Sequence, residues 1–209
     1  MVAIHPPPPV VAPTPVFLQI ATGTTVVRLF DPTSHGAQAL AFRHFGPISR
    51  FDHQRAPYPT RADDPDRSIM YGAFTLASCL AEIFGDSKII EVGAWEVAGL
   101  RTTRDLNLLD LRGNGALRAG TVSAVAKESN RQFSQTWSRY FYDHGFVYTE
   151  IDGLIFYNAH NDEEAFAFYD RASNGFQCAA ADIKPLRHDS LRTAIQDIAI
   201  ENGLVVIPY

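Results

Sequence analysis

The sequence predicts an α+β domain with mixed or antiparallel sheets and flanking helices. Runs rich in Val, Ile, Phe and Tyr, which are typical of strands, lie among stretches with helical periodicity. The two kinds of stretch do not alternate steadily, as they do in a doubly wound parallel sheet. The chain also has neither a Gly-x-Gly-x-x-Gly turn nor a Gly-Lys-Ser/Thr loop. Any dinucleotide bound by this chain must therefore be held by side chains instead of a glycine-rich turn.

The elements follow from local patterns. Strand-like runs cover residues 16–20, 26–30, 68–72, 89–97, 105–111, 154–158, 165–170 and 204–208. Apolar side chains recur at helical spacing in residues 75–84, 131–144 and 189–202. Asp189 or Ser190 suits the N-cap of the last helix, and Gly145 and Gly203 suit the ends of the second and third helices.

The domain organisation is simple. Residues 1–15 contain six of the 13 prolines, which predicts an extended or disordered arm, and a ligand for a proline-reading domain is the alternative. No linker or repeat is visible in residues 16–209, which we interpret as a single catalytic domain. A chain of 209 residues is long enough to bury a substantial core.

Composition excludes several classes of protein. The net charge of −5 and the pI of about 5.8 argue against a nucleic-acid surface, which needs a basic face. No apolar run has the length of a membrane span, and the N-terminus does not resemble a secretory signal. The two cysteines and the spacing of the seven histidines predict no disulfide framework and no metal site. We expect a cytoplasmic protein without a bound metal.

Glu82 is the first candidate for chemistry. At 100° per residue it lies roughly 130° from the centre of the apolar stripe of its helix, at an edge that could line a cleft. The alternative is a solvated surface glutamate. Tyr71 lies in the strand that precedes this helix, and a strand end and the following helix commonly frame a site together.

The arginines are candidates for an anionic ligand. Arg50 lies in a loop with Phe51 and Asp52, where it could bind phosphate or carboxylate in a bidentate manner, or form a structural Arg–Asp pair. Arg28 lies in an apolar strand and needs an anionic partner there, either a ligand phosphate or an internal carboxylate.

Two further polar residues have weaker support from the sequence. His53 could act as an acid or base, or as a hydrogen-bonded structural histidine. Ser134 could be a nucleophile or an ordinary serine at the start of a helix. The sequence places no base near it to activate a nucleophile.

These residues occur in blocks that resemble the RES domain family. The blocks are Val-Val-Arg-Leu-Phe at 26–30, Arg-His-Phe-Gly-Pro-Ile-Ser-Arg-Phe-Asp-His at 43–53, Ile-Met-Tyr-Gly at 69–72 and Cys-Leu-Ala-Glu-Ile-Phe at 79–84. Later blocks are Leu-Leu-Asp-Leu at 108–111 and Asp-Gly-Leu-Ile-Phe-Tyr at 152–157, followed by Phe-Ala-Phe-Tyr-Asp-Arg-Ala. The resemblance runs from about Val26 to Ala172.

The resemblance implies a fold similar to ADP-ribosyltransferase toxins and an activity that consumes NAD+. It also implies a toxin of a toxin–antitoxin pair, neutralised by an Xre-type antitoxin that covers the active cleft. Family members degrade NAD+ with water or phosphate as acceptor, and one branch transfers ADP-ribose to a protein. A catalytically silent binding module is the remaining alternative. NAD+ is the substrate in these schemes, and no cofactor is implied.

The resemblance also assigns roles to residues. Arg28, Arg50, Tyr71 and Glu82 match the family's two arginines, its strand tyrosine and its glutamate. Ser134 is assigned to the family's serine, with Ser138 nearby. Asn158 stands where another serine often occurs in the family, and we place Asn158 and His53 with Arg50 and Tyr71 among the NAD+ contacts. Glu82, Arg28 and Ser134 form the expected catalytic set.

Overall fold

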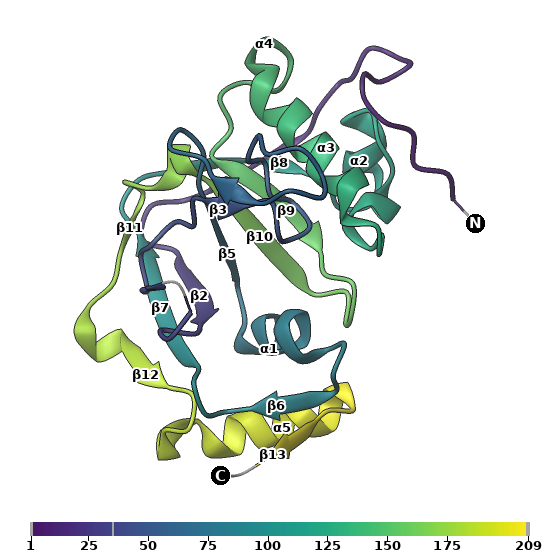
Figure 1. The fold of residues 1–209 in the computed structure, drawn as a ribbon. Helices are drawn as coiled ribbons and strands as arrows, with labels where there is room; N and C mark the ends of the chain where they lie inside the picture. Colours follow the sequence, from purple (N-terminus) through teal and green to yellow (C-terminus); the bar gives the residue numbers. More distant parts are fainter. Residues whose placement is uncertain (1, 35, 208–209) are drawn as a thin grey trace.

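A strongly curved mixed sheet is the centre of the computed structural model, which describes residues 2–34 and 36–207 (Figure 1). This sheet has nine strands within the described residues. Eight strands follow the order β1 (Phe17–Ile20), β8 (Leu106–Asp110), β9 (Gly153–Tyr157), β10 (Glu164–Tyr169), β5 (Ile69–Ala73), β2 (Thr25–Phe30), β7 (Glu96–Thr102) and β11 (Phe176–Gln177), while β12 (Ile183–Pro185) also pairs with β7. β8 and β9 run parallel, and the other neighbours are antiparallel. The predicted α+β class is confirmed.

Two small sheets flank the main one. β3 (Phe45–Gly46) pairs with β4 (Ala62–Asp63), and β6 (Ile89–Glu91) pairs in parallel with β13 (Val205–Ile207). The prediction of one strand over 89–97 is wrong, because a bend at Gly93 and Ala94 separates β6 from β7 and the two strands join different sheets. Pro208, the last residue of the predicted strand 204–208, lies outside the described residues.

The three predicted helices are confirmed as α1, α3 and α5. The helices are α1 (Leu76–Phe84), α2 (Asn114–Arg118), α3 (Arg131–Asp143), α4 (Gly145–Tyr148) and α5 (Arg192–Asn202), with 3₁₀ turns at Ser123–Ala126, Asp170–Ala172, Ala180–Asp182 and Asp189–Leu191. Asp189 and Ser190 do not cap α5, because they lie in a separate 3₁₀ turn and Leu191 is the N-cap. Gly145 begins α4 directly after α3. Gly203 ends α5 in the left-handed region, with φ of 63°.

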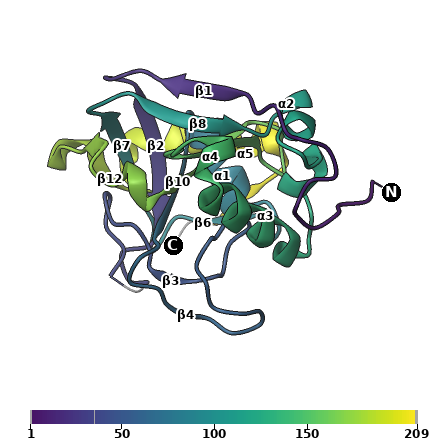
Figure 2. The same ribbon diagram turned by 90° about the horizontal axis from the view of Figure 1, so that it is seen from above.

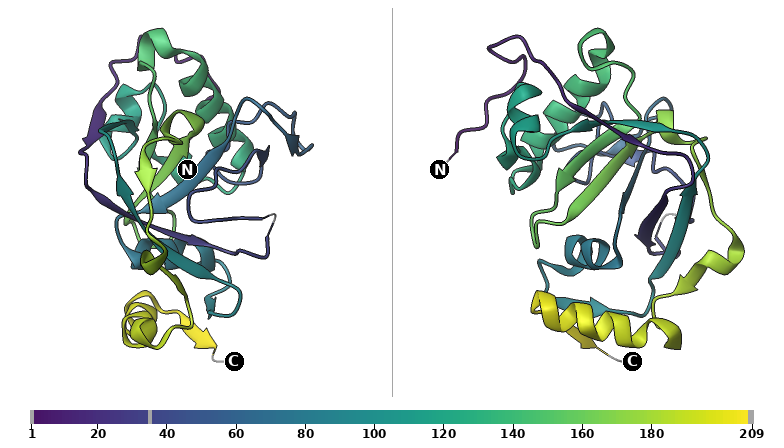
Figure 3. Two further views of the ribbon diagram at one scale, coloured as in Figure 1. Left: turned by 90° about the vertical axis from the view of Figure 1, so that its left-hand side faces the viewer. Right: turned by 180° about the vertical axis from the view of Figure 1, so that it is seen from behind.

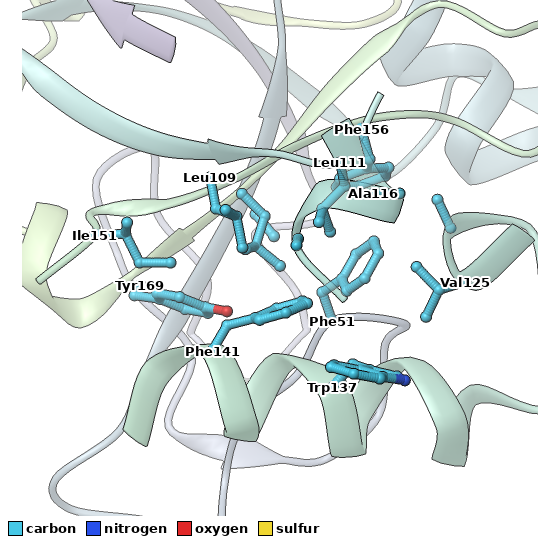
Figure 4. Close-up of a cluster of buried hydrophobic side chains, with 14 of the residues drawn as sticks. Phe51, Leu109, Leu111, Ala116, Val125, Trp137, Phe141, Ile151, Phe156 and Tyr169 are labelled. Carbon is cyan, nitrogen blue, oxygen red and sulfur yellow. The ribbon is translucent and has the colours of Figure 1, made fainter. Parts of the chain in front are cut away.

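Strand alternation divides the core between the two faces of the curved sheet. In β10, Phe166 and Phe168 point to the inner face, whereas Ala167 and Tyr169 point to the outer face. Helices α2, α3 and α4 cover the outer face. Figure 4 shows Phe51 in this outer core, between Trp137 of α3 and the strands.

Helix α1 lies between the main sheet and a terminal layer made of α5, β6 and β13 (Figures 1 and 3). The N-terminal arm, residues 2–15, has no regular secondary structure and packs against the helices on the outer face. There the indole of Trp137 donates a hydrogen bond of 2.8 Å to the carbonyl of His5. None of the helices in residues 2–34 and 36–207 has the length and apolar character needed to cross a membrane.

Candidate functional site

The main sheet is nearly split between β2 and β5. These neighbours share one register pair in the described chain, Val27 with Ala73, whereas β2 and β7 share six. A Cβ on Gly72 would lie 2.9 Å from Cγ1 of Val26, so only a glycine allows this close crossing. Beyond it, β5 pairs with Arg43 through Ile69 instead of with β2. The long segment between β2 and β5, which carries β3 and β4, lies to one side of the sheet (Figure 2).

A recess opens where the strands separate, and α1 forms one wall of it. Its empty volume is about 350 Å³ when the open solvent at its mouth is included. The lining is mostly apolar and includes Leu29, Tyr71, Ala73, Cys79, Glu82, Ile83, Phe156 and Phe166. Glu82 is the one carboxylate among the described lining residues, so any charge chemistry inside the recess depends on it.

The sequence of α1 explains why Glu82 faces the recess. Thr75 caps the helix by accepting a hydrogen bond from the backbone N–H of Ser78, at 3.0 Å. Cys79 and Leu80 pack into the core, which turns Glu82 toward the edge of the helix. Glu82 is half-buried, and its Oε2 is buried without a hydrogen-bond partner. The alternative of a solvated surface glutamate is therefore not what the structure shows.

Burial raises the pKa of the Glu82 carboxyl above its ordinary value, because the charged form loses hydration. Arg50, His160 and Arg131 oppose this shift, and Asp86 reinforces it. Groups from three different segments of the chain therefore favour the charged form of this half-buried carboxylate.

The loop that carries Arg50 is held by its neighbours in the sequence. Phe51 is fully buried, with its ring 4.6 Å from that of Phe156. Asp52 is also fully buried, and its carboxylate accepts hydrogen bonds of 2.8 Å from Arg43 and from the hydroxyl of Tyr71. The sequence allowed a structural ion pair between Arg50 and Asp52. Such a pair does hold this loop, but the arginine in it is Arg43.

This pairing leaves Arg50 without a carboxylate partner among the described residues. Its Nη1 donates to the backbone carbonyl of Glu128, and its Nε is buried without a partner. Because buried donors are nearly always satisfied, the unpartnered Nε makes Arg50 a candidate for contact with a ligand.

Tyr71 lines the recess with its ring, but its hydroxyl is occupied. The hydroxyl donates to Asp52 and accepts a hydrogen bond of 3.1 Å from the backbone N–H of Phe51. Burial and the nearby Asp52 raise the pKa of Tyr71 well above its ordinary value. Tyr71 can therefore offer a ligand its ring face, while its hydroxyl positions the Arg50 loop.

Arg28 lies on the face of β2 opposite Leu29, the residue that lines the recess. Its Nη1 donates to the carbonyls of Ala39 and Ala41, at 3.1 and 2.6 Å. Burial and the neighbouring Arg43 lower the pKa of Arg28 to about 10, so it stays protonated near neutral pH. Neither an internal carboxylate nor the Glu82 recess is in contact with its guanidinium within the described chain. Its observed partners are these two backbone carbonyls and the ring of Phe30, whose centroid lies 5.6 Å from the guanidinium carbon.

The two candidate serines of α3 differ. Ser134 is fully buried, and its Oγ has no hydrogen-bond partner. Ser138 is occupied, because its Oγ donates to the carbonyl of Phe51 at 2.6 Å and contacts the hydroxyl of Tyr169 at 2.9 Å. Ser134 therefore has the unpartnered hydroxyl of the two, but its side chain is enclosed and is not among the residues that line the recess.

The structure does not bring His53 or Asn158 into the recess. His53 is fully buried between the rings of Tyr142 and Tyr169, and its Nε2 lies 3.2 Å from Asp170. Burial lowers the pKa of this imidazole despite that carboxylate.

Asn158 is fully buried in the turn between β9 and β10. Its amide group donates to Ser78 and Asn161, and its carbonyl oxygen accepts from the backbone N–H groups of His160 and Asn161. Through its bond to Ser78, Asn158 links the β9–β10 turn to helix α1. All the hydrogen-bonding groups of its side chain are used in these contacts, so none is free for a ligand.

Sequence reasoning missed Asp52, Arg43, Arg131 and His160 as parts of the site. An aspartate two residues after Arg50 was visible as a partner in the loop, but nothing in the sequence assigned it to Arg43. Arg131 and His160 carry no local signal, because one begins a helix and the other lies in a turn. The part of the chain that the structure describes holds no group of three or more His, Cys, Asp or Glu side chains suited to a metal ion.

The curved split sheet, with α1 beneath the split, defines the class of this protein, an α+β fold like that of ADP-ribosyltransferases. The fold is shared with a chain in the crystal structure of the M. tuberculosis MbcT–MbcA toxin–antitoxin complex, with a TM-score of 0.58 and 14% sequence identity. That alignment covers 87% of this chain and 92% of the other. A search among curated proteins gives no match. The RES domain family model matches residues 25–190, and the chain belongs to this family.

Proposed function

We propose that this protein is the toxin of a toxin–antitoxin pair and that it cleaves the nicotinamide–ribose bond of NAD+, with water or phosphate as acceptor. Membership of the RES domain family supports the substrate, and the fold shared with a toxin–antitoxin complex supports the biological role. One observation carries the chemistry. The buried Oε2 of Glu82 has no partner inside an otherwise apolar recess.

Cleavage of this bond develops positive charge on the ribose ring, as in glycoside hydrolysis. Nicotinamide is already a cationic leaving group, so the reaction needs no general acid. A carboxylate in an apolar recess stabilises such charge more strongly than one in water. In this proposal, Glu82 binds a ribose hydroxyl and stabilises the cation. Arg50 and Arg131 favour the ionised carboxylate, which is the form that this role requires.

The remaining residues position the substrate. Arg50 binds the phosphates or the ribose with the donors that its bond to Glu128 leaves free. Tyr71 places a ring of the substrate against its own ring. Ser134 is fully buried outside the lining of the recess, so it is given no contact with the substrate in this proposal. Arg28 acts at a distance from the recess, by holding the backbone of residues 39–41 through its bonds to the carbonyls of Ala39 and Ala41. His53 and Asn158 are left out, because both side chains are enclosed and engaged elsewhere.

The test compares Glu82→Gln with the parent protein in a purified NAD+ consumption assay. Loss of the charge that stabilises the transition state should lower the rate by about 10²- to 10³-fold. Glu91→Gln is the matched control, because Glu91 is exposed on β6 and far less confined. Equal rates for Glu82→Gln and the parent would show that the assignment is wrong.

Product identification separates the acceptors. Water gives free ADP-ribose, and inorganic phosphate gives a phosphorylated ADP-ribose that appears only when phosphate is added. Label from NAD+ that stays on a polypeptide in cell extract would replace the proposal with protein ADP-ribosylation. Retained NAD+ binding without any turnover would identify a silent binding module.

We also propose an Xre-type antitoxin as the partner, acting in the cytoplasm. A toxin–antitoxin complex with the same fold supports a protein partner. Expression of this chain alone should arrest growth and lower cellular NAD+, and co-expression of a small Xre-like protein encoded beside it should restore both. Growth arrest without NAD+ loss would contradict the proposed activity.

A further inference from the structure

Two arginines from different segments each donate a hydrogen bond to a backbone carbonyl in the segment that carries the other. Arg50, in the loop after Pro47, donates through Nη1 to the carbonyl of Glu128. Arg131, the first residue of α3, donates through Nη1 to the carbonyl of Ile48, at 3.0 Å. Each guanidinium is thus fixed by the segment that carries the other. We call this reciprocal arrangement of Arg50 and Arg131 the arginine clasp.

Neither arginine of the clasp has a carboxylate partner. Across residues 2–34 and 36–207, five other arginines form ion pairs with Asp or Glu, but Arg50 and Arg131 form none. The nearby carboxylate of Glu128 is turned back on its own loop, where it accepts from the backbone N–H of Asn130 at 3.0 Å. The Nε of Arg50 is buried without a partner, which is a costly state for a charged group.

The clasp lies next to the recess, because the backbone N–H of Phe51, the residue after Arg50, donates a hydrogen bond of 3.1 Å to the hydroxyl of Tyr71, and Tyr71 lines the recess. Arg50 and Arg131 also lower the pKa of Glu82. Two arginines without an ion pair therefore lie beside the residues that line the recess. Each keeps donors that its single backbone bond does not use. A guanidinium whose orientation is already fixed loses less conformational entropy on binding an anion, and its planar fork matches a phosphate group.

We propose that Arg50 and Arg131 together bind a phosphate group at the mouth of the Glu82 recess. This inference rests on the proposed function for the source of the phosphate, which is either the diphosphate of NAD+ or a free phosphate acceptor. Arg131 then has a binding role that its position at the start of a helix did not reveal. A role in phosphate binding also explains why these two arginines bond to backbone carbonyls and form no salt bridge.

The test measures binding without turnover, using the full chain and isothermal titration calorimetry. ADP-ribose, inorganic phosphate and adenosine are the probes. Arg131→Gln should weaken ADP-ribose binding by about 10- to 100-fold, the effect of losing a charge-assisted hydrogen bond, and leave adenosine binding unchanged. Arg131→Lys keeps the charge but not the fork, and should give an intermediate affinity. Arg118→Gln is the matched control, because Arg118 is also exposed and bonded to a backbone carbonyl, that of Thr14 at 2.9 Å.

The probes also identify the source of the phosphate. If Arg131→Gln weakens the binding of ADP-ribose alone, the clasp binds the diphosphate of NAD+. If it weakens the binding of inorganic phosphate alone, the clasp binds the phosphate acceptor. Unchanged binding of both, equal weakening of adenosine, or no binding of either phosphate probe by the parent would overturn the inference. A thermal melt of each variant separates lost binding from lost folding. If the parent binds ADP-ribose through Arg131 but leaves NAD+ intact, the proposed function fails and the inference stands.

Discussion

The hydroxyl of Tyr71 donates a hydrogen bond of 2.8 Å to the carboxylate of Asp52, and this contact joins the middle of β5 to the loop of Arg50. The same carboxylate receives both hydrogen bonds from Arg43 and one from the backbone N–H of Ser49. One buried aspartate thus holds the loop in place through these hydrogen bonds, and Arg50 forms no ion pair in it.

Asp52 should therefore be a major contributor to stability. Asp52→Asn removes the negative charge opposite Arg43, and breaking a buried ion pair of this kind costs about 3 kcal/mol. Urea unfolding should show this loss. Asp66→Asn, which removes an exposed partner of Arg55, should leave the unfolding curve almost unchanged. Similar midpoints for the two variants would contradict the central role of Asp52.

Glu82 should lower the stability of the fold near neutral pH. Burial raises its folded-state pKa above that of the unfolded chain, so its contribution falls as pH rises through the folded pKa. Glu82→Gln should therefore be more stable than the parent at pH 8 and equal to it at pH 4. Thermal unfolding at the two pH values checks this. A stabilisation of the same size at both would not come from the ionisation of Glu82.

The groups around Glu82 should set the acidic limb of the pH–activity profile. His160 lowers the pKa of Glu82 and Asp86 raises it. The imidazole of His160 packs against Gly85 at the end of α1, with Nε2 3.8 Å from Asp86. His160→Gln should shift the acidic limb to higher pH, and Asp86→Asn should shift it to lower pH, by less because Asp86 is exposed. Shifts in the same direction would rule out this electrostatic account.

His53 should make the fold sensitive to acid. Its lowered pKa means that the unfolded chain binds a proton more readily than the folded protein does below about pH 6.5. Stability should fall as pH drops through this range. His53→Gln should flatten the fall between pH 7 and 5 in urea unfolding. His188→Gln, at an exposed histidine, should keep the parent's slope.

Local patterns predicted a large part of this fold. The helices α1, α3 and α5 and the strands β1, β2, β5, β8, β9 and β10 lie close to their predicted ranges, because each depends on neighbours two to four positions away. The short strands β3, β4, β11 and β12 had no such signal. Their pairing depends on the larger sheet, as the split prediction over 89–97 also shows.

The sequence by itself determined the α+β class, the family-like order of Arg28, Arg50, Tyr71 and Glu82, and the edge position of Glu82 on its helix. Tertiary structure decided which of these residues meet. It paired Asp52 with Arg43, enclosed His53 and Asn158, turned Arg28 to the other face of β2, and brought Arg131 beside Arg50. The physical reason is that helix and strand periodicity follows from adjacent residues. The partner of a charged side chain is set by contacts between segments far apart in the chain.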